Sequence, residues 1–375
     1  MKKVLSLLLS LAFCFATPTV VSAAEKYDAK SVVLMDMDSG TVLYKQNENE
    51  RLSPASVTKI MSLLLILEAL DKGNISLDDK VTATKDAVSK GGSQIWLEEG
   101  EVMTVDQLLK AVVIASANDA CTALGDYVAG SQTAFVKLMN DRAKELKLEN
   151  THFENCTGLD DTTTNHYSSA YDLALISGEV MKYDKIIKKY STVWLDSLRG
   201  GKTELNNTNK LVNTYDGITG LKTGTTSNAG FCVSATATRD NLNLVAVVLG
   251  APTSEVRFEI ASKLLDYGFA EYHSVTPKID EKKLTPVKVI NGVFKELTPI
   301  VENNMPLTLK KDDSNLKYKY VIKSDVTAPV TKGDKLGEIQ VINGKKVIKT
   351  IDLVSANTVR KVTFKMLFSH ILTNI

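Results

Sequence analysis

The spacing of apolar and polar residues near the start of the chain predicts a β-hairpin followed by a buried helix. Residues 31–46 alternate around a turn at residues 38–40, which is typical of a hairpin. Residues 60–70 are almost wholly apolar, and Gly73 follows this run closely. We therefore expect a helix over about residues 56–72 that is buried on every side, because a surface helix would show a polar face.

The middle of the chain has helical spacing and ends in a second hairpin and a helix. Residues 102–150 follow the helical period, with breaks near Ser116 and Gly130. Further along we expect a helix over residues 168–183 capped by Ser169 and Asp172, two strands over residues 231–251, and a helix over residues 254–269. Together these elements predict a domain over residues 25–272 of class α/β (α+β), in which helices cover a sheet.

The pattern changes in the last third of the chain. Residues 273–356 hold short β-type runs with Asn-Gly turns and many lysines, which predicts a small all-β domain. Residues 357–375 return to helical spacing, with Arg360, Lys361 and Lys365 largely opposite the apolar side. The apolar side consists of Phe364, Leu367, Phe368, Ile371, Leu372 and Ile375. We expect an amphipathic helix that lies on a membrane surface, because the segment is too short and too polar to span a bilayer. The alternative is a helix docked on the β-rich domain.

The first 24 residues have the composition of a secretory signal peptide. A positive start precedes an apolar run over residues 4–16, and small residues lead to Glu25. This run is shorter than the roughly 20 residues that a membrane span needs. We expect cleavage after residue 23 or 24, and an exported protein at the outer face of the cytoplasmic membrane or in the cell wall.

Composition and charge exclude several classes of function. The 375 residues are 44% apolar and 24% charged with a net charge of +1, which suits a soluble globular protein. Basic residues do not cluster around aromatic ones, so we expect no nucleic-acid partner. The histidines and cysteines lack the spacing of metal ligands, so we expect no metal and no other cofactor. Cys121, Cys156 and Cys232 remain after the signal is removed, which leaves room for one disulfide or for isolated buried thiols.

A serine and a lysine at the start of the apolar helix have the spacing of a catalytic pair. Ser56 and Lys59 are three residues apart, so a helix places them on one face. Burial beside the apolar run should lower the pKa of Lys59 and make the amine a candidate general base for the serine hydroxyl. The structural alternative is an N-cap serine followed by a lysine whose stem lies along apolar surface.

Two further motifs favour the catalytic interpretation. Ser116-Ala117-Asn118 interrupts a helical stretch, and Lys222-Thr223-Gly224 leads into a strand. Each motif alone is a plausible loop or turn. Together, in the order SxxK, SxN and KTG, they form the motif set of penicillin-binding proteins and class A β-lactamases.

The sequence resembles the low-molecular-weight penicillin-binding proteins, the serine-type D-alanyl-D-alanine carboxypeptidases of the peptidase S11 type. The resemblance is specific at SPASVTKIM, ASANDACTAL, HYSSAYDLALIS and GITGLKTGTTSNAGFCVSATA. It implies a serine β-lactamase/DD-peptidase-like catalytic domain with a helix-covered antiparallel sheet and a nucleophile on a buried central helix. It also implies peptidoglycan stem peptides and β-lactam antibiotics as ligands, and a C-terminal membrane-surface helix.

The resemblance implies a catalytic role for four side chains. Ser56 attacks the carbonyl between the last two D-alanines of a stem peptide, and Lys59 takes the serine proton. Ser116 relays that proton towards the leaving amine, and Asn118 orients Lys59 or the substrate amide. Water then hydrolyses the acyl-enzyme and releases D-alanine.

The resemblance also implies substrate-binding roles for the KTG motif and its neighbours. Lys222 adds positive potential, and the Thr223 hydroxyl holds the terminal carboxylate of the substrate. Gly224 completes the motif, and the backbone N–H of Thr225 binds the oxyanion together with that of Ser56. Some relatives have histidine at the position of Thr225, so this chain lacks that side chain's contribution. Arg257 is either a partner of the carboxylate or an ordinary charge on a helix surface.

Three other interpretations compete with a carboxypeptidase. A serine β-lactamase shares the three motifs, but Glu154 is not followed by the Leu-Asn that class A enzymes have. A Ser-His-Asp hydrolase would need a GxSxG elbow, which the sequence lacks, and His166 is expected in a turn. A non-catalytic cell-wall binding module would not require Ser56 and Lys59. The sequence leaves open any transpeptidase or endopeptidase side activity, the preferred stem peptide, the role of the β-rich domain and the oligomeric state.

Overall fold

A computed structural model describes residues 26–366, apart from residues 162 and 314. The expected signal peptide and most of the apolar face of the expected C-terminal helix lie outside the described residues. No helix in the described part of the chain is long and apolar enough to cross a membrane.

A five-stranded antiparallel sheet forms the centre of the N-terminal part, in the order β2-β1-β9-β8-β7. Its strands are β1 (Ser31–Asp36), β2 (Val42–Gln46), β7 (Ile218–Thr226), β8 (Gly230–Arg239) and β9 (Leu242–Ala251). The two hairpins predicted from the sequence are therefore confirmed. The first and last strands of this sheet along the chain are neighbours, because β1 pairs with β9 and Val33 lies opposite Val247.

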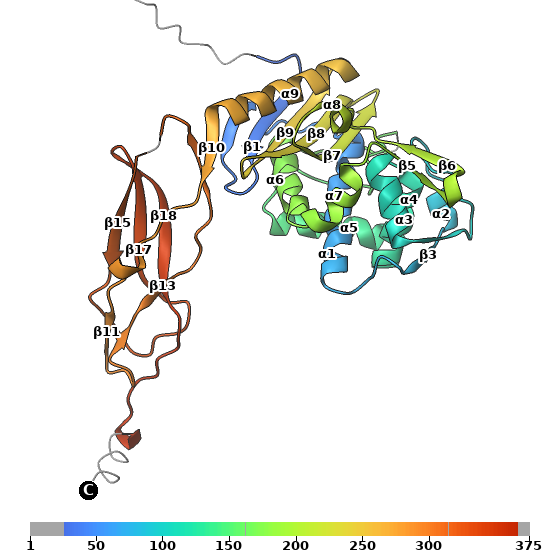
Figure 1. The fold of residues 1–375 in the computed structure, drawn as a ribbon. Coiled ribbons are helices and arrows are strands. Elements are labelled where there is room, and N and C mark those ends of the chain that lie inside the picture. The colour runs from blue at the N-terminus through green and yellow to red at the C-terminus, as the bar shows by residue number, and fades with distance from the viewer. Residues whose placement is uncertain (1–25, 162, 314, 367–375) are drawn as a thin grey trace, which may run out of the picture.

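Helices cover both faces of this sheet (Figure 1). Strand β1 is buried on both sides, and its alternate residues enter different cores. Val32 and Leu34 pack with α9 (Ser254–Glu271), while Val33 and Met35 pack with α1 (Lys59–Asp71) and α6 (Ala170–Met181). The expected class, a sheet covered by helices, is confirmed.

The N-terminal part also contains further helices and two two-stranded sheets. They are η1 (Ala55–Thr58), α2 (Lys85–Val88), α3 (Val105–Ile114), α4 (Asn118–Ala129), α5 (Gln132–Glu145), α7 (Asp184–Ser191), η2 (Arg199–Gly201), α8 (Leu211–Thr214), and the strand pairs β3 (Lys80–Thr82) with β4 (Val102–Thr104) and β5 (Leu195–Leu198) with β6 (Thr203–Asn206). The predicted breaks near Ser116 and Gly130 separate α3, α4 and α5. Most of α1 is buried, including Lys59, as its apolar sequence predicts.

The C-terminal part is a set of small β-sheets that extends away from α9 (Figure 1). Its elements are β10 (Tyr272–Val275), η3 (Glu281–Lys283), β11 (Val287–Ile290), β12 (Glu296–Leu297), β13 (Pro299–Val301), β14 (Leu307–Lys310), β15 (Leu316–Ile322), β16 (Asp325–Thr327), β17 (Lys335–Asn343) and β18 (Lys346–Ser355). Two separate apolar cores hold it together. At the joint, the hydroxyl of Thr308 donates to the carboxylate of Asp36 and lies 2.8 Å from the Ser39 hydroxyl.

The end of the chain differs from the helix expected over residues 357–375. Val359 forms a β-bridge with Val330, and Lys361 forms one with Gly292. Helix begins only at Phe364. No helix forms at these positions, because their backbone N–H and C=O groups pair with distant residues instead of with the next helical turn. The rest of the predicted helix lies outside the described residues.

Candidate active site

Ser56 lies in a 3-10 turn rather than in the first turn of an α-helix. The turn, η1, runs straight into α1, whose first residue is Lys59. Ala55 has a φ of 48°, which is unusual for a residue with a side chain. The Nζ atom of Lys59 donates to the Oγ atom of Ser56 at 2.8 Å. The predicted pair is therefore in direct contact.

Lys59 is fully buried and has two hydrogen-bond acceptors. Besides Ser56, its Nζ atom bonds the carbonyl oxygen of Thr157 at 2.9 Å. Burial lowers the pKa of Lys59 to about 8, because the charged form loses its hydration. The predicted burial and the predicted direction of the pKa shift are confirmed. A neutral amine at this distance can accept the serine proton.

The loop that carries Thr157 packs tightly on η1. Gly158 has a φ of 83°, and a Cβ there would lie 1.8 Å from the carbonyl oxygen of Ala55. The Asn155 side chain accepts the backbone N–H groups of Thr157 and Gly158 at 3.1 and 2.7 Å. The loop can therefore hold the Thr157 carbonyl at Lys59 only with glycine at position 158.

The SxN motif brings two unpaired polar atoms into the buried interior. Ser116 has a φ of 62°, and its hydroxyl has no hydrogen-bond partner among the described residues. Asn118 donates its side-chain amide to the Gly91 carbonyl at 2.7 Å, while its Oδ1 atom has no partner in the described chain. Buried polar atoms are normally paired, so these two are available for a ligand.

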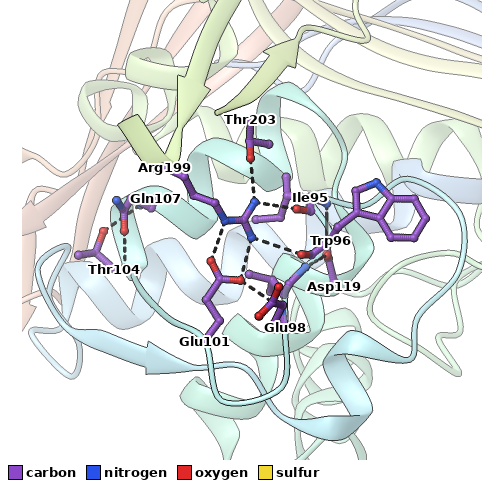
Figure 2. Close-up of polar contacts among 10 residues, drawn as sticks. Ile95, Trp96, Glu98, Glu101, Thr104, Gln107, Asp119, Arg199 and Thr203 are labelled. Carbon is purple, nitrogen blue, oxygen red and sulfur yellow. Dashed lines mark hydrogen bonds and ion pairs between the residues drawn. The ribbon is translucent and has the colours of Figure 1, made fainter. Parts of the chain in front are cut away.

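A polar clamp holds the loop that supports Asn118 (Figure 2). The carboxylate of Asp119 accepts the backbone N–H groups of Ile95 and Leu97. Arg199 forms a bidentate ion pair with Glu101, at 2.7 and 2.8 Å. Arg199 also donates to the carbonyl of Ile95 in the same loop. Such paired, charge-assisted bonds restrict the loop geometry more than single bonds do.

The KTG motif lies on β7, facing the serine turn. Lys222 is buried, and its Nζ atom bonds the Thr223 carbonyl at 3.0 Å. Burial holds the pKa of Lys222 well below its usual value, and the charges of Lys59 and Arg257 lower it further. A Cβ on Gly224 would lie 2.8 Å from the Ser56 nitrogen. The absence of a side chain thus lets the strand approach the backbone of the candidate nucleophile.

Arg257 lies beside the KTG strand rather than on the protein surface. Its Nη1 atom donates to the carbonyls of Gly224 and Cys232 at 3.0 and 3.1 Å, and to the Thr225 hydroxyl at 3.0 Å. Its guanidinium also stacks on Phe231 and Phe258. Because the side chain is only 7% exposed, the alternative of an ordinary surface charge is wrong.

Comparison with known proteins identifies the family. Residues 17–253 match the peptidase S11 family model, described as D-alanyl-D-alanine carboxypeptidase. The chain belongs to this family. Residues 272–361 match the model of the penicillin-binding protein 5 C-terminal domain.

Several relatives are similar to the carboxypeptidase over most of its length. It is 43% identical to the D-alanyl-D-alanine carboxypeptidase DacF of Bacillus subtilis, an alignment covering 90% of this chain and 87% of the relative. It is 37% identical to DacC of Escherichia coli, covering 89% and 86%. Penicillin-binding protein 5 from Haemophilus influenzae has a similar structure, with a TM-score of 0.81 at 30% identity over 90% of this chain and 99% of that one. The predicted activity, that of a serine-type D-alanyl-D-alanine carboxypeptidase, is confirmed.

Sequence reasoning missed three contacts of this carboxypeptidase's site. The carbonyl of Thr157 bonds Lys59, and the hydroxyl of Thr208 accepts from Thr223 at 2.7 Å. His166, expected in a turn, is buried against η1. No local motif marks these residues, because each acts through a contact distant in sequence. Among the described residues no cluster of histidine, cysteine or acidic side chains could hold a metal ion, and Cys121, Cys156 and Cys232 are buried free thiols.

Proposed function

We propose that Ser56 is the nucleophile of the carboxypeptidase and Lys59 its general base. The observation that carries this assignment is the 2.8 Å contact between the Ser56 hydroxyl and a buried amine whose pKa is about 8. The Ser56 oxygen bonds the carbonyl carbon of the terminal D-Ala-D-Ala link while its proton passes to Lys59. The link breaks, and the leaving D-alanine amine takes up a proton. Water then cleaves the serine ester and regenerates the hydroxyl.

The developing oxyanion lies between the backbone N–H groups of Ser56 and Thr225 in this proposal. The close approach of Gly224 to the Ser56 nitrogen supports it, since the strand and the turn face each other there. One such donor is typically worth roughly 3–4 kcal/mol of transition-state stabilisation. The donors are backbone groups, so the threonine side chain at position 225 does not affect them.

Ser116 and Asn118 assist the leaving group and the substrate amide. The Ser116 hydroxyl has no partner among the described residues, so it is free to pass a proton to the departing amine. The unpaired Oδ1 atom of Asn118 can accept a substrate N–H, while the Gly91 carbonyl fixes the other end of its amide. This arrangement favours a substrate-orienting role for Asn118.

The terminal carboxylate of the substrate binds beside the KTG strand. Arg257 supplies positive potential, and a bound carboxylate would also favour the charged form of Lys222, whose pKa burial lowers. The hydroxyls of Thr223 and Thr225 supply hydrogen bonds once they rotate away from Thr208 and the Gly224 carbonyl, to which they donate here. Arg257 already donates to the Thr225 hydroxyl at 3.0 Å, so it orients that group. Gly224 lies between these residues and allows the strand its close approach. A carboxypeptidase needs such a site because its substrate carries a free carboxylate next to the scissile link.

We also propose where the enzyme acts. Residues 1–24 direct export, residues 25–272 hydrolyse the stem peptide at the outer face of the cytoplasmic membrane or in the cell wall, and β-lactam antibiotics acylate the same serine. Residues 273–356 hold this domain away from the membrane, and residues 357–375 lie on the membrane surface. The basic residues from Arg360 onward and the helix that begins at Phe364 support this last assignment.

Labelling by penicillin tests the nucleophile. Mass spectrometry of the full mature chain should find a penicilloyl adduct on the peptide containing Ser56, and Ser56→Ala should abolish both the adduct and the release of D-alanine from a diacetylated D-Ala-D-Ala tripeptide. Ser53→Ala is the matched control and should retain labelling. An adduct on any other residue would refute the assignment.

A further inference from the structure

The end of the β-rich domain is a compact unit made from two distant segments. One is the last residue of β11 together with the turn that leads to β12, residues 290–295, and the other is residues 360–366. Val293 donates its backbone N–H to the Arg360 carbonyl at 3.0 Å, and Val362 donates to the Asn291 carbonyl at 2.8 Å. We call these two segments together the distal tip.

The backbone of the turn is tightly constrained. Asn291 has a φ of 60°. A Cβ on Gly292 would lie 2.6 Å from a methyl group of Val289 and 3.0 Å from one of Val359, which is fully buried. The turn is therefore packed against the small core of this domain, and its outward side chains cannot move inward without displacing that packing.

The distal tip nevertheless exposes large apolar side chains. Phe294 is 61% exposed, and Ile290 and Val293 are also exposed. Phe364 and Met366, from the second segment, are exposed as well. Apolar groups gathered at one end of a soluble domain are typical of a surface that contacts a partner or a membrane.

The charges of the distal tip favour a membrane over a protein partner. Lys295, Arg360, Lys361 and Lys365 are all exposed, and none forms an ion pair with a described residue. Residues 290–295 and 360–366 contain no acidic residue. Exposed aromatic and aliphatic side chains among unpaired cations suit the interfacial region of a bilayer that contains anionic lipids.

The position of the tip fits the same partner. Figure 1 shows β11 and the last described residues of the chain, drawn in red, at the end of the β-rich domain remote from the central sheet. We propose that the distal tip is a membrane-contact site in its own right, in which Phe294 and Val293 enter the interface of an anionic bilayer. This inference rests on the proposed membrane location, but it assigns binding to a folded turn about 60 residues before the C-terminal segment.

Depth-dependent fluorescence quenching tests the insertion directly. Phe294→Trp in the full mature chain should show a blue-shifted emission that brominated lipids quench in vesicles of phosphatidylglycerol and phosphatidylcholine. Val347→Trp is the matched control. Val347 is 50% exposed but lies at the start of β18, the end of that strand remote from the distal tip, so an indole there should remain unquenched. The native Trp96 and Trp194, both in the catalytic domain, provide a background that lipid should not change.

Vesicle partitioning gives a second measurement. We expect Phe294→Ser to weaken binding about tenfold or more, and Lys295→Gln to weaken it about fivefold on anionic vesicles only. Val347→Ser should leave binding unchanged, and all three variants should hydrolyse the tripeptide at the normal rate.

The outcomes separate this inference from the proposed membrane location. If the full chain binds vesicles but the indole at position 294 is as unquenched as the one at 347, the distal tip inference is wrong and the C-terminal anchor stands. If the full chain does not bind anionic vesicles at all, both are wrong. Quenching at 294 together with weaker binding of Phe294→Ser supports the distal tip.

Discussion

The Nε2 atom of His166 lies 2.8 Å from the Oγ1 atom of Thr58, although the two residues are 108 positions apart in the chain. The Nδ1 atom of the same ring accepts the backbone N–H of Glu154 at 3.1 Å. A neutral ring that accepts at Nδ1 carries its proton on Nε2, so it donates to Thr58. His166 thus ties the loop that carries Thr157 to the turn that carries Ser56.

We predict that His166 makes the stability of the enzyme depend on pH. Burial lowers the pKa of His166 to about 4 from an ordinary value of 6.5. Below pH 6.5 His166 therefore binds a proton in the unfolded chain but not in the folded chain. The free energy of unfolding falls as the pH falls towards 4. The loss amounts to about 3 kcal/mol at 1.36 kcal/mol per pKa unit.

Urea unfolding measured from pH 7.5 to 4 checks this prediction. His166→Gln keeps hydrogen-bonding groups but cannot titrate, so its stability should fall less steeply over this range. His273→Gln, on β10, should retain the slope of the unmodified enzyme. Equal slopes for the His166 variant and the unmodified enzyme would contradict the assignment.

We predict that acylation requires the neutral form of Lys59. Because the pKa of Lys59 is about 8, the rate of acylation by penicillin should rise with pH and level off above 8. Lys59→Arg keeps the positive charge but cannot lose its proton, so the acylation rate should fall by about 10²–10⁴. Lys72→Arg, just after the same helix, should acylate normally. Near-normal acylation by Lys59→Arg would exclude the base role.

We predict that Gly158 tolerates no side chain, because of contact rather than backbone conformation alone. Gly158 and Gly100 both have a φ of 83°, but a Cβ at Gly100 meets nothing within 4 Å. Gly100→Ala should therefore cost about 1–2 kcal/mol of unfolding free energy from backbone strain. Gly158→Ala should cost at least about 3 kcal/mol and should also slow acylation, since the clash is with the residue before Ser56. Similar losses in the two variants, measured by urea unfolding, would show that the contact does not matter.

We predict that Arg257 contributes geometry as well as charge. Arg257→Lys retains a cation but loses the planar group that reaches Gly224, Thr225 and Cys232. We expect kcat/KM for the tripeptide to fall about 10–100-fold, mainly through a higher KM, because the carboxylate site is less well ordered. Arg239→Lys, which removes a guanidinium stacked on Tyr215 and Phe269, should leave KM unchanged. An unchanged KM in Arg257→Lys would assign this residue to stability alone.

Local sequence determined much of this protein. The hairpin at the start of the catalytic domain follows from alternation around a turn, and the hairpin at its end follows from two strand-like runs separated by the turn at residues 239–241. The helices around the breaks near Ser116 and Gly130 follow from the 3.6-residue period. The Ser56–Lys59 contact was also predictable, because three residues of helical backbone bring the two side chains together without help from the rest of the fold.

Only the tertiary structure decided the surroundings of that pair. The carbonyl of Thr157 reaches Lys59 across 98 positions, and the environment of Arg257 depends on strands that are 25 to 33 positions away. At the end of the chain, pairing of Lys361 with Gly292 replaces a helix that the local spacing predicts. The physical reason is the same in each case: local periodicity specifies which face of an element is apolar, but packing decides which distant backbone groups meet it, and buried N–H and C=O groups take the partners that packing provides.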